Sequence, residues 1–148
     1  MMEALKVAKY IINKCIELEK PISNLQLQKI MYFVQLDFLK ETRKKLITDE
    51  FKAWQYGPVL EEVYYKYRIF GSNKMFLPEE DSQLDLSDEE QSIINQTIEK
   101  SIKLPAWELV QKSHHPNGAW VATFKDGAGD KNTIPDFLIE KEALGNGR

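Results

Sequence analysis

The sequence predicts a mainly α-helical fold: a compact bundle of about five or six helices around a central apolar helix at residues 25–40, with at most a short β-hairpin near residues 46–56. Apolar residues recur at helical spacing through most of the chain, which indicates helices that share one core. Residues 25–40 are apolar nearly all round, as expected for a helix covered on several sides. Residues 46–56 instead combine aromatic and β-branched residues without a helical period.

The first predicted helix spans residues 3–19. Its apolar face repeats at the spacing of helical turns and is formed by Ala4, Ala8, Ile11, Ile12 and Cys15. Pro21 is expected to end this helix. Ser23 or Asn24 can then cap the central helix, because either side chain can accept a hydrogen bond from the free backbone amides of a first turn.

One or two short strands are expected within residues 46–56, where large apolar side chains lie between polar ones. Gly57-Pro58 is expected to break that run and to open a helix over residues 58–70. Proline fits the first turn of a helix, where its missing N–H is not needed. Gly71 would cap the C-terminal end of that helix.

The second half of the chain begins with an expected loop at residues 72–86. Ser87 and Glu90 have the spacing of a capping box, which starts a helix that runs to about Lys103. A short helix is expected over residues 105–113.

The last part of the chain, residues 115–132, is expected to be a long loop that is interrupted by the apolar run 120–124. Thr133 is expected to cap a last helix with Pro135 in its first turn. The side chains available to pack that helix are Phe137, Leu138 and Leu144.

Length and composition bound the class of protein. The 148 residues suit one domain, so residues 1–148 are expected to form a single unit. The 20 basic and 23 acidic residues give a net charge of −3, which argues against a dedicated nucleic-acid binder. Cys15 is the only cysteine, which excludes an intramolecular disulfide and a cysteine-based zinc cluster. Charges interrupt every apolar run, so we expect a cytoplasmic protein with no membrane partner.

Few residues suggest catalysis. His114 and His115 are the only histidines and could form a metal site or an acid–base pair with nearby acids. Adjacent residues of an extended segment point in opposite directions, and the chain has no H-x-x-x-H spacing. Gly127-Ala128-Gly129 lacks the Gly-Lys-Ser/Thr that follows in a phosphate-binding loop. No metal, cofactor or catalytic residue is therefore predicted.

Three short motifs are more distinctive. They are Leu27-Gln28-Lys29-Ile30-Met31-Tyr32-Phe33, Ala53-Trp54-Gln55-Tyr56-Gly57-Pro58-Val59, and Ser113-His114 followed by Trp120. A sharp turn at Gly57 would aim the rings of Trp54 and Tyr56 toward one place. Tryptophan and tyrosine combine an apolar body with a polar donor, which makes them frequent hot spots of protein interfaces. Packing in the core is the alternative, and for Trp54 both remain open.

The three motifs, in this order, resemble those of the Panacea domain family, as in SocA-like antitoxins and phage-associated GepA-like proteins. The resemblance runs from about residue 4 to residue 125. After Phe124 the match is less clear, and the loop between His114 and Trp120 is longer here. The resemblance implies an antitoxin, encoded on a prophage or other mobile element, that binds and neutralises a cognate toxin. It also implies an adaptor that hands the toxin to an AAA+ protease.

The sequence and the resemblance together predict a non-enzymatic antitoxin of a type II toxin–antitoxin system. The residues expected to bind the partner are Trp54, Tyr56, Gly57, Pro58, Tyr65, His114 and Trp120. One rival is a DNA-binding regulator of its own operon, against which stands a predicted helix 58–70 with only Lys66 and Arg68 as basic residues. The other rival is a small hydrolase that uses His114 or His115.

Overall fold

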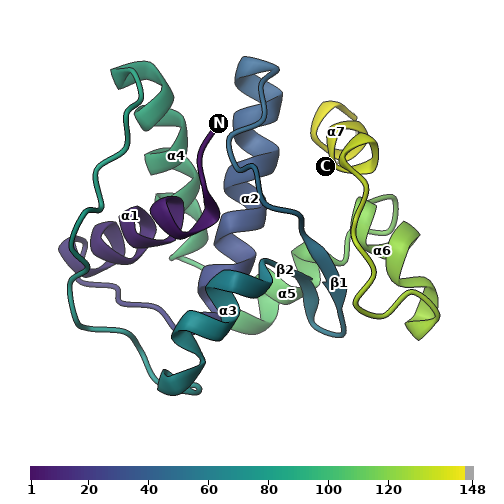
Figure 1. The fold of residues 1–148 in the computed structure, drawn as a ribbon, viewed down its shortest axis with the longest axis horizontal. Coiled ribbons are helices and arrows are strands. Elements are labelled where there is room, and N and C mark those ends of the chain that lie inside the picture. Colours follow the sequence, from purple (N-terminus) through teal and green to yellow (C-terminus); the bar gives the residue numbers. More distant parts are fainter. Residues whose placement is uncertain (146–148) are drawn as a thin grey trace.

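The computed structural model describes residues 1–145. Within this range the elements are α1 (Ala4–Glu17), α2 (Asn24–Thr42), β1 (Lys52–Trp54), β2 (Gly57–Val59), α3 (Glu61–Tyr67), the 3-10 helix η1 (Arg68–Phe70), α4 (Asp88–Ser101), α5 (Ala106–Ser113), α6 (Ala119–Phe124), the 3-10 helix η2 (Lys125–Gly127) and α7 (Asp136–Leu144). The predicted fold class is confirmed: the fold is mainly helical with one small hairpin (Figure 1).

Helix α2 runs through the middle of the fold, as predicted (Figure 1). It contacts α1, α3, α4, α5 and α7, and its apolar side chains are buried on several sides. Ser23 is its N-cap: the Ser23 Oγ accepts a hydrogen bond from the Gln26 N–H at 3.3 Å, and the Gln26 Oε1 accepts one from the Ser23 N–H at 2.9 Å. No helix within residues 1–145 is both long enough and apolar enough to cross a membrane.

The hairpin lies later in the chain than the predicted 46–56. Strands β1 and β2 pair antiparallel with Ala53 opposite Pro58, so the expectation that Pro58 opens a helix is wrong. The backbone of Ala53 points away from β2: its N–H donates to the Asn132 carbonyl at 2.8 Å and its carbonyl accepts from the Lys131 N–H at 2.6 Å. The ladder therefore needs no N–H from Pro58, and helix α3 begins only at Glu61.

The segment that follows η2 lies along the other edge of β1. Thr133 forms an antiparallel bridge with Lys52, and its Oγ1 accepts a hydrogen bond from the Lys52 Nζ at 2.7 Å. The predicted cap at Thr133 is therefore wrong. Helix α7 starts after Pro135 without a side-chain cap.

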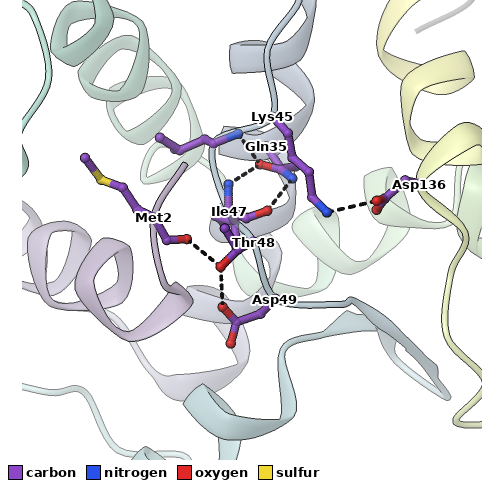
Figure 2. A network of polar contacts seen from close by, with 8 residues as sticks. Met2, Gln35, Lys45, Ile47, Thr48, Asp49 and Asp136 are labelled. Atoms are coloured by element: carbon purple, nitrogen blue, oxygen red, sulfur yellow. Dashed lines mark hydrogen bonds and ion pairs between the residues drawn. The ribbon is translucent and has the colours of Figure 1, made fainter.

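Residues 46–48, expected in a strand of the hairpin, pair instead with the N-terminal end of the chain. The Met2 N–H donates to the Leu46 carbonyl at 2.7 Å, and the Thr48 N–H donates to the Met2 carbonyl at 2.9 Å. The buried Gln35 of α2 binds the same segment, since its Oε1 accepts from the Ile47 N–H at 2.9 Å (Figure 2). One side chain of the central helix thus fixes the path into the hairpin.

The apolar run 120–124, expected to interrupt a loop, lies in the additional helix α6, which begins at Ala119. The Ala119 N–H in its first turn donates to the Glu142 Oε1 of α7 at 2.9 Å. A carboxylate at a helix N-terminus satisfies a free amide and interacts favourably with the helix dipole. A residue far along the chain thus helps to start α6, which local sequence could not indicate.

Of the three residues expected to pack helix α7, only Leu138 lies against the core, and it is partly buried. Ile139 and Ala143 are buried, whereas Phe137 is 68% exposed and Leu144 is 46% exposed. The buried face is set by Glu142, whose Oε1 also accepts a hydrogen bond from the Tyr32 hydroxyl of α2 at 2.7 Å. Residues three and four positions apart share that face, which turns Phe137 and Leu144 outward.

The capping box predicted at Ser87 is confirmed. The Glu90 N–H donates to the Ser87 Oγ at 3.1 Å, and the Ser87 N–H donates to the Glu90 Oε1 at 3.0 Å. Helix α5 follows Pro105, as expected.

Candidate partner-binding site

The three motifs, from separate parts of the chain, meet beneath the hairpin. Lys29 of α2 donates from its Nζ to the Pro58 carbonyl at 3.0 Å. Ser113, the last residue of α5, lies against the same turn: a Cβ at Gly57 would stand 2.5 Å from the Ser113 Oγ and 3.1 Å from the Lys29 Nζ. All four residues are buried. The motifs therefore form one packed unit.

Lys29 is the most unusual residue of this unit. Its side chain is fully buried, and burial lowers the pKa of its amine to about 7. Among the described residues it makes no ion pair. Its hydrogen bond to the Pro58 carbonyl ties the hairpin to α2 without a neutralising carboxylate.

Two further polar residues of α2 connect it to α3. The Gln28 Oε1 accepts from the Leu60 N–H at 2.9 Å, where α3 is about to begin, and the Gln28 Nε2 donates to the Asn24 Oδ1 at 3.1 Å. The Asn24 Nδ2 in turn donates to the Tyr64 carbonyl at 3.1 Å. Apolar periodicity predicts that this helix packs in the core and assigns no role to the side chains of Gln28 and Asn24 in holding α3. The polar pair Gln28-Lys29 inside an otherwise apolar motif was the available signal.

Trp120 is a structural link between α6 and β1. Its indole Nε1 donates to the Trp54 carbonyl at 2.7 Å, and its ring stacks with those of His114 and Phe124 at centroid distances of 3.7 and 4.6 Å. Burial lowers the pKa of His114, the charge of Lys29 lowers it further, and a hydrogen bond with the Tyr56 backbone opposes both effects. Trp120 and His114 therefore support the hairpin from the side of α6.

Trp54 lies half-buried at the edge of the hairpin. Its ring packs edge-to-face against Tyr64 and Tyr65 of α3 at centroid distances of 4.9 and 6.2 Å. Its Nε1 donates to the Glu61 Oε2 at 3.3 Å, and the Lys131 Nζ lies 5.5 Å from the ring centroid. Trp54 thus belongs partly to the scaffold and partly to the surface.

The predicted binding residues divide into support and surface. Tyr56, in the turn of the hairpin, is 61% exposed, and Tyr65 of α3 is 49% exposed. We call Trp54, Tyr56 and Tyr65 the aromatic surface. The other predicted residues lie beneath or beside it: Gly57, Pro58 and Trp120 are buried and His114 is half-buried.

The hydrolase hypothesis depends on His114 or His115, and a metal site would need several ligands close together. No cluster of three possible metal ligands occurs within residues 1–145. His114 stacks on Trp120, whereas His115 lines a separate groove between α2, α4 and α5. The two histidines of the hydrolase hypothesis therefore do not face a common site.

Comparison with known proteins identifies the family. The sequence profile described as "Antitoxin SocA-like, Panacea domain" matches residues 27–121, a segment that contains all three motifs. Antitoxin SocA of Caulobacter vibrioides (strain NA1000 / CB15N) is 32% identical over 129 residues, which cover 80% of this chain and 69% of that protein. No solved structure matches the chain. The unit beneath the hairpin is thus built from segments that the family profile covers, and the chain belongs to the SocA-like antitoxin family with a Panacea domain.

Proposed function

We propose that this chain is the antitoxin of a type II toxin–antitoxin system and that it neutralises its toxin by direct binding, not by catalysis. Residues 1–148 would act as a single domain in the cytoplasm. Membership of the SocA-like family supports the antitoxin role. The structural observation that carries the proposal is an exposed aromatic surface held on a buried polar anchor.

The anchor makes the aromatic surface suitable for binding. The Lys29 Nζ donates to the Pro58 carbonyl and the Gln28 Oε1 accepts from the Leu60 N–H, so the chain is held on both sides of Val59. The Trp120 Nε1 holds the backbone of Trp54. A surface that is already ordered loses less conformational entropy when a partner binds. Tyrosine also presents large area at a small entropic cost, because it has few rotatable bonds.

Co-expression with the product of the adjacent gene tests the proposal. We expect this chain to restore growth and to form a stable complex with that product. The double variant Tyr56→Ala/Tyr65→Ala should keep its melting temperature and lose about 2 kcal/mol of binding free energy, roughly thirtyfold in affinity. Phe137→Ala is the matched control, because Phe137 is 68% exposed but lies on α7.

Two outcomes would contradict the proposal. If a demonstrably toxic neighbour is not neutralised, the antitoxin role fails. If the double tyrosine variant binds the toxin like Phe137→Ala, the interface lies elsewhere on the molecule.

We also propose, from the family, that the gene lies on a prophage or other mobile element and that the bound toxin is delivered to an AAA+ protease. Delivery predicts that the toxin is degraded faster when this chain is co-expressed. A pulse-chase of the toxin in cells with and without each AAA+ protease measures this rate. An unchanged half-life in every strain would leave binding alone as the mechanism.

A further inference from the structure

A groove of about 440 Å³ lies between α2, α4 and α5 and extends to the loop after α5. It begins about one helical turn along α2 from Lys29, at Phe33, and none of the three aromatic-surface residues lines it. We call it the basic groove. Its volume is within the range of pockets that hold small ligands or a few side chains.

Three lysines from three helices line the basic groove: Lys40 of α2, Lys100 of α4 and Lys112 of α5. All three are exposed. Lys100 lies 4.0 Å from the Asp37 Oδ2, whereas Lys40 and Lys112 make no ion pair with any residue in the described range. On a chain of net charge −3, two exposed lysines without an ion-pair partner among the described residues thus lie at one groove.

The two carboxylates that line the groove are already engaged. Asp37 accepts a hydrogen bond from the Thr97 hydroxyl at 2.8 Å. Glu142 accepts from the Tyr32 hydroxyl at 2.7 Å and from the Ala119 N–H at 2.9 Å. Both acids keep their charge in these hydrogen bonds, but Asp37 already faces Lys100 and Glu142 is buried, so the exposed charge at the groove comes from the lysines.

Part of the lining is apolar. Leu109 of α5 is buried, and Phe33 of α2 and Leu104, between α4 and α5, are half-buried beside it. A ligand that matches this lining needs carboxylates for the lysines and an apolar side chain for the space between them.

We propose that the basic groove binds a short acidic segment of a partner protein, with carboxylates at Lys40 and Lys112 and an apolar side chain against Phe33 and Leu104. Complementary charge at the rim favours encounter and orientation, and the apolar contact supplies burial. A nucleic acid fits less well, because its affinity requires several phosphate contacts along a basic surface. This inference rests on the proposed function in one respect: it assumes that the partner is a protein.

Isothermal titration of the full chain with the acetylated peptide Leu-Glu-Glu-Leu-Glu-Glu tests the groove without the toxin. We expect saturable binding that weakens as NaCl is added. The variant Lys40→Glu/Lys112→Glu should bind at least about tenfold more weakly. The control Lys6→Glu/Lys20→Glu makes the same change of net charge at exposed lysines outside the groove and should bind like wild type.

The inference is wrong if Lys40→Glu/Lys112→Glu and Lys6→Glu/Lys20→Glu lose peptide affinity equally. It is also wrong if a peptide with glutamine in place of glutamate binds as well. Preferential binding of inorganic phosphate or a single-stranded oligonucleotide at the same lysines would overturn it too. If circular dichroism shows that Lys40→Glu/Lys112→Glu does not fold, the single variant Lys112→Gln replaces it. Unchanged peptide affinity in Lys112→Gln would also count against the proposed groove. Absence of peptide binding in a chain that still restores growth refutes the groove alone. Peptide binding by a chain that does not neutralise the toxin supports the groove and refutes the antitoxin role.

Discussion

Gly57 is the position where one added methyl group should be most informative. Its φ of +115° is in the region that L side chains rarely adopt, and a Cβ there would stand 2.5 Å from the Ser113 Oγ. The same Cβ would lie 3.1 Å from the Lys29 Nζ. Gly57→Ala therefore combines backbone strain with overpacking at the point where the three motifs meet.

The two costs can be estimated separately. A non-glycine residue at positive φ costs roughly 1–3 kcal/mol, and overpacking of a well-packed site costs about 1–3 kcal/mol more. We expect Gly57→Ala to reduce the free energy of unfolding by about 2–6 kcal/mol. Gly127 provides the matched control, because its φ is +104° but nothing lies within 4 Å of its would-be Cβ. Gly127→Ala should therefore carry the strain without the overpacking.

Urea denaturation of the two alanine variants measures the difference between them. Both variants reduce the entropy of the unfolded chain equally, so that effect cancels in the comparison. In a Ser113→Ala background, which removes the Oγ, the Gly57→Ala penalty should shrink toward that of Gly127→Ala. If the two glycine variants are equally stable in the wild-type background, the close approach of Gly57 to Ser113 and Lys29 is not a constraint on the fold.

The remaining predictions concern the anchor, the aromatic surface and DNA. Burial holds the pKa of Lys29 at about 7 against 10.5 for an ordinary lysine, so the unfolded chain binds more protons above pH 7 and wild-type stability should rise with pH. Urea denaturation from pH 7 to about 8, where the Cys15 thiol is still mostly protonated in the unfolded chain as well, should show a rise of up to ~1.4 kcal/mol per pH unit. Lys29→Met should lack this rise, and parallel profiles would mean that Lys29 is not the titrating group. Trp54→Ala should lower the free energy of unfolding by about 2–3 kcal/mol, which is less than the loss at a fully buried aromatic residue. Tyr56→Ala should stay within about 0.5 kcal/mol of the wild-type stability. Thermal melting that finds Tyr56→Ala less stable than Trp54→Ala would contradict the burial assigned to the two rings. A mobility-shift assay at physiological salt should detect no specific binding of the isolated protein to its own promoter, and a tight, salt-sensitive complex would restore the DNA-binding hypothesis.

The sequence by itself determined the elements whose signals are local. The capping box of Ser87 and Glu90 marked the start of α4, because its two hydrogen bonds join residues three positions apart. The apolar character of α2 identified the central helix, since only a helix with neighbours on several sides can bury such a surface. The three motifs also indicated the family and the part of the chain that forms the candidate site.

Only the tertiary structure decided where distant segments satisfy one another. Pro58 lies in a strand because the backbone of Ala53 is bound by the segment after η2, and α6 forms where Glu142 accepts the Ala119 N–H. Lys29, which lies in a motif with the pattern of core packing, is the anchor of the hairpin. Hydrogen bonds between residues far apart in the sequence depend on the packing of the whole chain. Local spacing and propensity therefore could not tell which aromatic rings would remain exposed for a partner.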